Sequence, residues 1–517
     1  MRICLTALQK SLMKALRLLL EGIPCSWNGK GELATQIACV HSDSRKIKTG
    51  DLFVSTLGLK VDGHQFIFDA IQKGAKAIVS ERFDSKVSEL GIPQFVVSDS
   101  SSILSRLVAS SYDFPAQKLT LIGITGTNGK TTTAFLAQHL LNSVSRAGLI
   151  GSIQYDDGKT KEAAEYTTPI PEVLNEVLAR MVANGLSYCV MEVSSHALAQ
   201  SRTQDFEFSS ALFTNLTQDH LDFHQDFEEY YQAKRKLFFG ETSPRHSIVN
   251  LDDPFGLRLA VEIGNRGDLV SYGLNGTRDY SASGIQMDWK GLSFDLTYKG
   301  NQFRVAAPLL LRHNVYNVLT ALSTVLEEGF SFRELVPYLS QFPGVVGRME
   351  RIDEGQDFHV FIDYAHTPDG LLSVLSSLQG LPRNRVISVF GCGGDRDRRK
   401  RPIMGEIGSR FSDVLILTSD NPRGEKPEDI LDQIRSGIPW DRKRADVIVI
   451  SNRSEAIRQA IEMAEPCDLV LIFGKGHEPY QILGKEKIPF SDQSVARHWL
   501  RERCLRSTKL HKFAAGH

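Results

Sequence analysis

The sequence predicts an α/β protein of three domains: a mixed α/β domain first, a parallel-sheet domain in the middle, and a doubly wound, Rossmann-like domain last. Three observations support this prediction. The 517 residues exceed what one hydrophobic core usually holds, because domains commonly span about 100–200 residues. Short apolar runs alternate with helical stretches, which is typical of parallel sheets. Glycine is frequent, with 41 residues and no collagen-like period, which favours many tight turns.

The charge balance argues against a nucleic-acid binder. Lys and Arg total 60 and Asp and Glu total 61, which gives a formal net charge of −1. Nucleic-acid binding needs a basic excess or stripe instead. Hydrophobic residues make up 42% and charged residues 23%, ordinary values that exclude wholesale disorder. We therefore expect small-molecule ligands and no nucleic acid.

The sequence also argues against a membrane or an oxidising setting. No uncharged run approaches the roughly 18 residues of a membrane span. The basic, Leu-rich segment 1–20 is interrupted by charges and predicts an amphipathic helix rather than a signal peptide. The seven Cys form no CxxC pair and their number is odd, which disfavours a zinc ribbon or a disulfide framework. We expect a cytoplasmic protein without membrane insertion.

The first domain is expected over residues 1–115. Short β-like runs separated by turn clusters are followed by a helical stretch at 102–112, and Asp113-Phe114-Pro115 ends the domain. The expected strands are 36–40, 52–56, 77–80 and 94–97.

The middle domain is expected over residues 116–345. Apolar runs at 119–125, 187–193 and 209–213 predict parallel strands. Residues 268–308 are interpreted as antiparallel hairpins, and 314–328 as a helix.

The last domain is expected over residues 346–505, where the alternation repeats and predicts a doubly wound sheet. The expected strands are 385–390, 414–418, 447–450 and 469–473, and the expected helices are 400–411, 427–436, 454–464 and 494–504. Residues 506–517 are expected to be a frayed basic tail.

A glycine-rich turn, Gly123-Ile-Thr-Gly-Thr-Asn-Gly-Lys-Thr131, follows an apolar strand and opens a helix. This is the setting of a P-loop, in which backbone N–H groups hold phosphate oxygens, Lys130 reaches the β- and γ-phosphates, and Thr131 binds Mg²⁺. The strict spacing would place a glycine at Ile124, so the loop is a variant. The middle domain is thus expected to be an ATPase domain.

Two further strands of the middle domain end in polar residues. Glu192 closes one strand, and His220 follows another. Catalytic groups gather at the carboxyl ends of parallel strands, so Glu192 and His220 are candidate metal ligands or phosphate-positioning residues. Taken alone, each would more often be a solvated loop residue. Lys234 lies in a helix with basic and aromatic faces, and for it the sequence alone favours a solvated basic face.

Three strands of the last domain end in polar loops, at 391–397, 420–423 and 474–478. Together the loops offer Arg for a carboxylate and Asp or Glu for an ammonium, which suits an amino acid. The alternative is that Asp420 and Asn421 only cap a helix starting at Pro422. Arg348 and Asp363, at the start of the last domain, are candidates for contacts with nucleotide phosphate and ribose.

The order of these motifs resembles the Mur ligase family of peptidoglycan synthesis across nearly the whole chain, and within it the members that add the third residue of the peptide. Asp420-Asn-Pro-Arg423 is similar to the signature of the meso-diaminopimelate-adding type. The motifs are Thr125-Gly-Thr-Asn-Gly-Lys-Thr131, Thr167-Thr-Pro169, Glu192-Val-Ser-Ser-His196, Asn215-Leu-Thr-Gln-Asp-His-Leu-Asp222, His313-Asn-Val-Tyr-Asn317, Gly347-Arg-Met-Glu350 and Asp363-Tyr-Ala-His-Thr-Pro368.

The resemblance implies roles for individual residues. Those that would hold ATP are Gly126, Thr127, Asn128, Gly129, Lys130, Thr131, Thr132, Asn314, Arg348 and Asp363. Those that would hold the UDP-muramoyl peptide are Ser44, Thr167, Thr168, Ser194, Gln200 and Arg202. Those that would hold meso-diaminopimelate are Arg396, Asp420, Asn421, Pro422, Arg423, Gly474 and Glu478. Lys234, in the pattern Tyr-x-x-Ala-Lys, matches the family's carbamylated lysine, formed with CO₂, which would bind Mg²⁺ with Thr131, Glu192 and His220. Catalysis would rest on Lys130, Glu192, His220 and Lys234.

The resemblance also implies an activity: ATP-dependent joining of meso-diaminopimelate to UDP-N-acetylmuramoyl-L-alanyl-D-glutamate through an acyl phosphate, by a monomer. The departures from the family pattern are Ala197, Leu311 and Arg399, and Arg399 adds a charge near the amino-acid loops. Three alternatives remain: the same ligation with L-lysine, which needs no Arg423, a folylpolyglutamate synthase, and a P-loop regulatory protein that only binds nucleotide.

Overall fold

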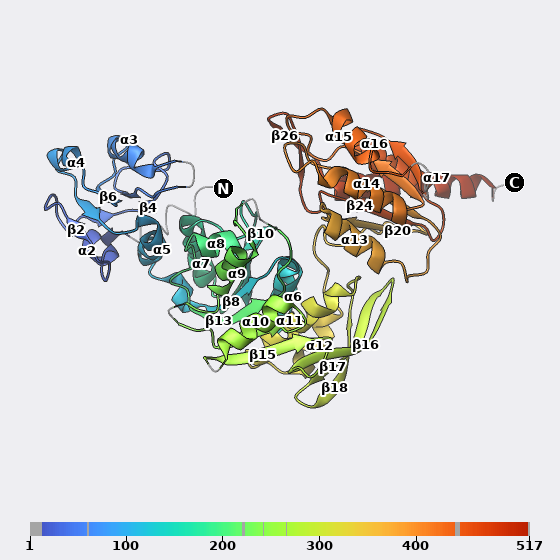
Figure 1. Cartoon of the computed structure of the whole chain (residues 1–517), viewed down its shortest axis with the longest axis horizontal. Coiled ribbons are helices and arrows are strands. Elements are labelled where there is room, and N and C mark those ends of the chain that lie inside the picture. The colour runs from blue at the N-terminus through green and yellow to red at the C-terminus, as the bar shows by residue number, and fades with distance from the viewer. Residues whose placement is uncertain are drawn as a thin grey trace. The chain divides into compact units, whose positions relative to one another are not determined.

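The computed structural model describes residues 13–58, 61–219, 223–240, 242–264, 266–439 and 445–514, with side chains as far as Arg506. The chain forms two compact units. Unit 1 comprises residues 1–283, 295–303 and 316–339, and unit 2 comprises 284–294, 304–315 and 340–517. Figure 1 follows the chain from blue to red. Among the described residues, no helix is both long enough and apolar enough to cross a membrane.

The N-terminal part of unit 1 is a five-stranded sheet with helices on both faces. The strand order is β2-β7-β6-β5-β4, and β4 to β7 run parallel. One face packs on the leucines of α2 and α5, and the other on α3 and α4. The strands are β2 (Ser26–Trp27), β4 (Val40–His41), β5 (Leu52–Val54), β6 (Ala77–Ser80) and β7 (Gln94–Val96); the helices are α2 (Leu16–Leu19), η1 (Gly63–Phe66), α3 (Ile67–Gln72), α4 (Ser85–Glu89) and α5 (Ser100–Ser111); β1 (Lys14–Ala15) and β3 (Gln36–Ile37) form a separate ribbon.

The middle of the chain builds an eleven-stranded sheet in the order β11-β10-β9-β12-β8-β13-β14-β15-β16-β17-β18. Strands β9 to β15, apart from β10 and β11, pair in parallel around β8, the strand before the glycine-rich turn. The strands are β8 (Thr120–Thr125), β9 (Ala147–Ile150), β10 (Gln154–Asp156), β11 (Lys161–Ala163), β12 (Tyr188–Glu192), β13 (Phe208–Phe213), β14 (His246–Asn250), β15 (Asp268–Gly273), β16 (Tyr280–Asp288), β17 (Gly291–Tyr298) and β18 (Asn301–Ala307).

Helices cover this sheet and share its core with the strands. Leucine and valine side chains of α7 and the tyrosines of α9 pack in one continuous apolar cluster with the strands. Helix α6, which starts at Lys130, packs against β9, β12 and α12. The helices are η2 (Pro115–Lys118), α6 (Lys130–Val144), α7 (Pro171–Ala183), α8 (Ser195–Ala199), α9 (Phe227–Arg235), α10 (Pro254–Ile263), α11 (His313–Glu327) and α12 (Phe332–Leu339).

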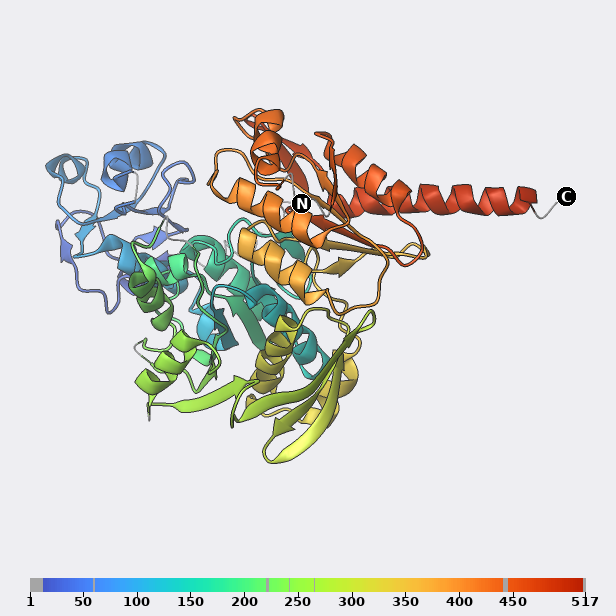
Figure 2. The same ribbon diagram turned by 45° about the vertical axis from the view of Figure 1, so that its right-hand side comes forward.

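The last domain, within unit 2, is doubly wound. Its six strands have the order β19-β20-β24-β21-β22-β23, and all but β19 run parallel. Helices α13, α14 and α15 cover one face, and α16 and α17 cover the other. Figure 2 shows α13 and α14 side by side in orange, and α17 projecting beyond the sheet. The strands are β19 (Glu350–Arg351), β20 (His359–Asp363), β21 (Val386–Phe390), β22 (Val414–Leu417), β23 (Asp446–Val449), β24 (Leu469–Phe473), β25 (Tyr480–Leu483) and β26 (Glu486–Pro489); the helices are α13 (Pro368–Ser377), α14 (Lys400–Phe411), α15 (Pro427–Arg435), α16 (Arg453–Met463) and α17 (Asp492–Ala514).

The structure confirms the α/β class and corrects several local expectations. Residues 268–273 form β15, which pairs in parallel with β14 and β16 and is not part of an antiparallel hairpin. Residues 505–514, expected to fray, continue helix α17. Of the expected N-terminal helix, residues 1–12 lie outside the described residues, and only Leu16–Leu19 are helical in the remainder. The hairpin of β25 and β26 was not expected from the sequence.

Candidate active site

The glycine-rich turn between β8 and α6 is built from positions that no other residue could fill. Gly126 has φ +145°, and a Cβ there would lie 1.9 Å from Thr214 Oγ1. Gly129 has φ +88°, and a Cβ there would lie 2.4 Å from Asn317 Oδ1. A side chain at either position would have to displace a neighbour. The turn therefore presents bare backbone at the start of α6, as a phosphate-binding loop requires.

The segment after β13 holds the loop through hydrogen bonds. The Thr127 N–H donates to the Asn215 carbonyl at 2.8 Å, and the Asn128 N–H donates to Asn215 Oδ1 at 2.9 Å. Lys130 Nζ lies over its own loop and donates to the carbonyls of Gly126 and Thr127 at 2.8 and 2.9 Å. The lysine is therefore at the loop, within reach of any anion bound there. Thr132 is buried in the first turn of α6.

Glu192, at the end of β12, lies beside the first turn of α6. Its carboxylate is fully buried and accepts from Thr131 Oγ1 at 3.0 Å. It also accepts from the Ser152 N–H at 2.8 Å and Ser152 Oγ at 3.1 Å. A carboxylate and a hydroxyl in contact are oxygen donors of the kind that Mg²⁺ prefers, so these two residues fit that ion. Among the described residues, no group of three or more His, Cys, Asp or Glu side chains is arranged so that it could hold a metal ion, and His220 lies outside the described residues.

Lys234 is buried, so the solvated basic face favoured by the sequence alone is wrong. Its side chain on α9 is 1% exposed, and Nζ donates to the Gly126 carbonyl at 2.8 Å. Nζ also lies 4.5 Å from the centre of the Tyr230 ring. Burial, together with the charge of Lys130, lowers the pKa of Lys234 well below its ordinary value. The structure thus brings Lys234 to the same loop as Lys130, in buried surroundings that disfavour its charged form.

A polar network joins five of the predicted UDP-substrate residues to the strand that carries Glu192. Thr168 Oγ1 donates to the Glu192 carbonyl at 2.8 Å and accepts from the Ser194 N–H at 3.0 Å. The Arg202 guanidinium donates to the Thr168 carbonyl at 2.5 Å and to Gln200 Oε1 at 3.0 Å. Thr167 Oγ1 lies 3.0 Å from Ser152 Oγ, and so connects to the same carboxylate. Ser44 is in the N-terminal sheet domain, where its carbonyl accepts from Lys73 at 3.2 Å.

The loops after β22 and β24 meet in a buried polar cluster. Asn421 Nδ2 donates to Glu478 Oε2 at 2.9 Å. Lys475 Nζ, fully buried, donates to Asn421 Oδ1 and to Glu478 Oε2, both at 3.1 Å. Lys475 was not among the residues predicted from the sequence; its place between two glycines in Gly474-Lys-Gly476 was the available signal. A Cβ on Gly474 would lie 2.6 Å from Asp420 Oδ2, so the two loops approach each other closely at Gly474, where there is no side chain.

Arg423 is held by the hairpin of β25 and β26. Its backbone is left-handed, with φ +51°, and its N–H donates to the Ile482 carbonyl at 3.1 Å. Its Nη1 donates to the Gly394 carbonyl at 2.9 Å. Helix α15 begins at Pro427, so Asp420 and Asn421 are not helix caps at Pro422, and that alternative is excluded. Arg396 is exposed on the neighbouring loop.

The remaining predicted nucleotide residues lie in unit 2. Asp363, at the end of β20, accepts from the N–H groups of Met349 and Ala365, both at 2.8 Å. Burial raises its pKa. The Arg348 guanidinium stacks 4.6 Å from the centre of the Tyr364 ring. Asn314 is buried, and its side chain donates to the Leu310 carbonyl at 2.5 Å.

Three family models match the chain in succession. They are the Mur ligase family catalytic domain over residues 36–112, the Mur ligase middle domain over 124–325, and the Mur ligase glutamate ligase domain over 347–476. The chain belongs to the Mur ligase family. The order of sheet, P-loop sheet and doubly wound sheet is the three-domain architecture of that family, and the chain is a ligase of the Mur type.

Close relatives of this Mur ligase are known. It is 42% identical over 475 residues to the UDP-N-acetylmuramoyl-L-alanyl-D-glutamate--2,6-diaminopimelate ligase 1 of Clostridium acetobutylicum, covering 91% of this chain and 96% of that protein. It is 43% identical over 468 residues to the ligase of the same name from Gloeobacter violaceus, covering 90% and 94%. A solved structure of such a 2,6-diaminopimelate ligase is 30% identical, with a TM-score of 0.69, and covers 95% of this chain and 99% of that one.

Proposed function

We propose that this Mur ligase uses ATP to join meso-diaminopimelate to the D-glutamate of UDP-N-acetylmuramoyl-L-alanyl-D-glutamate. The observation that carries the choice of amino acid is the cluster of Asn421, Lys475 and Glu478 beside Arg423, in a chain whose relatives at 42–43% identity are named for 2,6-diaminopimelate. Because its sugar nucleotide substrate is a soluble precursor, the reaction belongs in the cytoplasm. We expect a monomer.

The proposal divides the work among the domains. Residues 1–115 would take part in binding the UDP-muramoyl peptide, 116–345 would carry ATP binding and 346–505 the amino acid. Ser44 would contribute from the first domain, and the network of Thr167, Thr168, Ser194, Gln200 and Arg202 from the second. The nucleotide would be held by Gly126 to Thr132 together with Asn314, Arg348 and Asp363.

Phosphate binding is supported by the bare backbone of the loop. The φ values and close neighbours of Gly126 and Gly129 keep side chains off the turn before α6, where backbone N–H groups would bind phosphate oxygens. Lys130 would leave its two carbonyl partners and bind the β- and γ-phosphates. Thr131, Glu192, His220 and the modified Lys234 would hold Mg²⁺, which when bound supplies a positive charge that neutralises phosphate oxygens.

Carbamylation of Lys234 suits its buried position. A neutral amine attacks CO₂: the N–C bond forms, one proton leaves to solvent, and an anionic carbamate results. Burial and the charge of Lys130 lower the pKa of Lys234, which favours the neutral, nucleophilic amine. The product is an anionic oxygen ligand at the P-loop, beside the Gly126 carbonyl that Lys130 also contacts.

The reaction then runs in two steps. The D-glutamyl γ-carboxylate attacks the γ-phosphorus, the bond to the bridging oxygen breaks, and ADP leaves. The amine at the L-centre of meso-diaminopimelate attacks the acyl phosphate carbonyl, loses a proton, and expels phosphate to leave the amide. Lys130 stabilises charge on the phosphoryl group, as is usual in phosphoryl transfer.

Recognition of the amino acid follows from charge and shape. A bidentate Arg suits a carboxylate, so Arg423 would bind the D-centre carboxylate, with Arg396 near it. Asp420 and Glu478 would bind an ammonium, and Asn421, Pro422 and Gly474 would shape the subsite. A P-loop regulatory protein that only bound nucleotide would not need these amino-acid-binding loops.

The test is ligation measured with a panel of amino acids. With ATP, Mg²⁺ and the UDP-muramoyl dipeptide, meso-diaminopimelate should be joined and phosphate released, and L-lysine and L-ornithine should support much lower rates. Equal use of L-lysine would favour the lysine-adding alternative. Phosphate release that ignores the UDP-muramoyl dipeptide would contradict the proposal altogether.

A further inference from the structure

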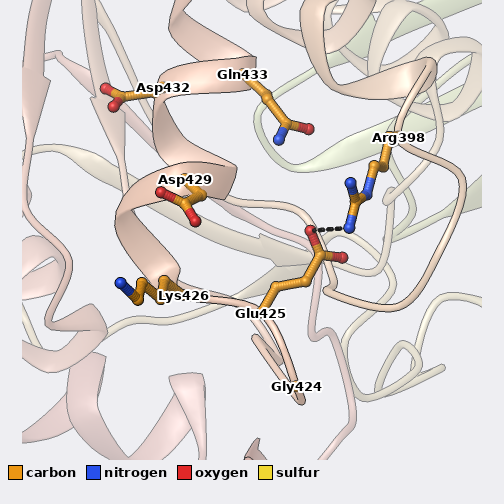
Figure 3. A pocket seen from close by; sticks show the side chains of 7 residues that line it. All are labelled: Arg398, Gly424, Glu425, Lys426, Asp429, Asp432 and Gln433. Carbon is orange, nitrogen blue, oxygen red and sulfur yellow. Dashed lines mark ion pairs between the residues drawn. The ribbon is translucent and has the colours of Figure 1, made fainter.

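A buried ion pair ties together two of the loops assigned to the amino acid. Arg401, on α14, donates from Nη2 to Glu425 Oε1 at 2.8 Å and from Nη1 to Glu425 Oε2 at 2.9 Å. The Arg401 side chain is 0% exposed, and Glu425 follows Arg423 by two residues. Figure 3 shows Glu425 beside Arg398, a second partner at 3.1 Å, on the wall of a hollow of about 490 Å³.

The same pair holds the loop after β21. Arg401 Nη2 donates to the Gly393 carbonyl at 3.1 Å, and Glu425 Oε1 accepts from the Asp395 N–H at 2.7 Å. Arg401 and Glu425 therefore each bond to the loop of 391–397 as well as to one another. The hydrogen bonds from Arg401 keep the pKa of Glu425 down, at about 2, so the carboxylate is charged at any working pH.

Arg423 depends on this loop for its orientation. Its Nη1 donates to the Gly394 carbonyl at 2.9 Å, and the Gly394 N–H donates to the Asn421 carbonyl at 2.9 Å. Asp395 Oδ2 accepts from the Gly424 N–H at 3.0 Å. The guanidinium of Arg423 is thus directed by a carbonyl whose position the ion pair controls.

The two loops are too close to move independently. A Cβ on Gly394 would lie 1.8 Å from the Pro422 carbonyl oxygen, and one on Gly393 would lie 2.8 Å from Arg423 Nη1. Gly394 has no room for a side chain against this backbone, and a side chain on Gly393 would displace the Arg423 guanidinium. A shift of the loop of 391–397 would therefore move Pro422 and Arg423 with it, because backbone contacts this close transmit displacement.

We propose that Arg401 and Glu425 are positioning residues, which set the direction of the Arg423 guanidinium and so the affinity for the D-centre carboxylate. The inference rests on the proposed function, because it assigns Arg423 to that carboxylate. It adds a role for two residues that touch no substrate: loss of the pair should weaken meso-diaminopimelate binding and leave ATP binding intact.

The test compares Glu425→Gln with wild type and with a matched control. Glu425→Gln should raise KM for meso-diaminopimelate about tenfold, with kcat and KM for ATP changed less than about twofold. The control is Asp468→Asn, which breaks another ion pair of the same domain, between the buried Asp468 carboxylate and the partly exposed Arg385 at 2.7 Å, at the amino ends of β21 and β24. It should lower thermal stability and leave KM for meso-diaminopimelate unchanged.

A double-mutant cycle decides whether the pair acts through Arg423. In an Arg423→Ala background, Glu425→Gln should have no further effect on KM for meso-diaminopimelate. Equal effects in both backgrounds, or a KM within twofold of wild type in the single variant, would overturn the proposal.

If Glu425→Gln does not fold, Arg401→Lys, which keeps the charge but cannot span Glu425 and Gly393 together, serves in its place. A wild-type enzyme that does not use meso-diaminopimelate would instead contradict the proposed function, before any variant is made.

Discussion

Gly126 is the residue on which the phosphate loop depends most directly. Gly126→Ala would place a methyl group 1.9 Å from Thr214 Oγ1 at a φ of +145°. The loop would have to shift, and its N–H groups would no longer point at the phosphate oxygens. We expect ligase activity to fall at least a hundredfold. ATP with Mg²⁺ should raise the thermal midpoint of the wild type but not that of the variant. Gly380→Ala, at a glycine with open space around it, should keep both.

Arg423 is the residue that distinguishes the proposed substrate from L-lysine. Arg423→Lys keeps the charge but loses the fork that binds a carboxylate through two parallel hydrogen bonds. KM for meso-diaminopimelate should rise about ten- to hundredfold, and the low activity with L-lysine should stay the same. Steady-state kinetics with both amino acids measure this. A parallel loss with L-lysine would indicate general damage to the site.

At the scale of elements, a buried ion pair joins α16, α17 and the end of β24. Arg453 and Asp492 pair at 2.7 Å with both side chains 0% exposed, and Arg453 Nη2 donates to the Phe473 carbonyl at 2.8 Å. Asp492→Asn leaves a buried guanidinium without its partner charge, so the free energy of unfolding should fall by about 3–5 kcal/mol. Urea denaturation measures this. Glu462→Gln, which breaks the exposed pair with Arg506 between the same helices, should cost less than about 1 kcal/mol.

His477, in the loop after β24, should make the stability of the protein depend on pH. Burial, with the charge of Arg348 nearby, lowers the pKa of His477 to about 4. In the unfolded chain the value is about 6.5, so between these values the unfolded state binds more protons and stability falls as pH drops. The free energy of unfolding should decrease from pH 7 to pH 4.5 by about 1–3 kcal/mol more in the wild type than in His477→Gln. Equal decreases in both proteins would show that His477 does not contribute.

At the scale of the whole molecule, the chain forms two units that each have their own hydrophobic clusters. Three clusters belong to unit 1 and two to unit 2, among the residues that the structure describes. Chains with separate cores commonly unfold in more than one step. Scanning calorimetry should therefore show at least two transitions, and Asp492→Asn should lower the midpoint of one while leaving the other in place. A single transition that shifts as a whole would contradict this expectation.

Much of the site could be predicted because its signals are local. The phosphate loop is a strand followed by Gly126 and Gly129, with Lys130 and Thr131 opening the next helix, and the other candidate residues are polar groups at strand ends. Each of these signals spans only a few positions of the sequence. The strands β6 and β24 and the helix α14 start and end where the periodicity predicts. Leu311, which departs from the family pattern at a position where that pattern often has glycine, adopts a left-handed φ of +74°. The family pattern therefore carried information about the backbone at this position.

What the sequence by itself determined was the α/β class, the phosphate loop and the family, because propensity, periodicity and motif spacing act over short distances along the chain. The tertiary structure alone decided that Lys234 is buried at the carbonyl of Gly126, and that Lys475 joins Asn421 to Glu478. It also decided that Arg401 holds Glu425 and that β15 runs parallel to its neighbours. Burial, and the partner of a charged side chain, depend on residues far away in sequence that only folding brings into contact.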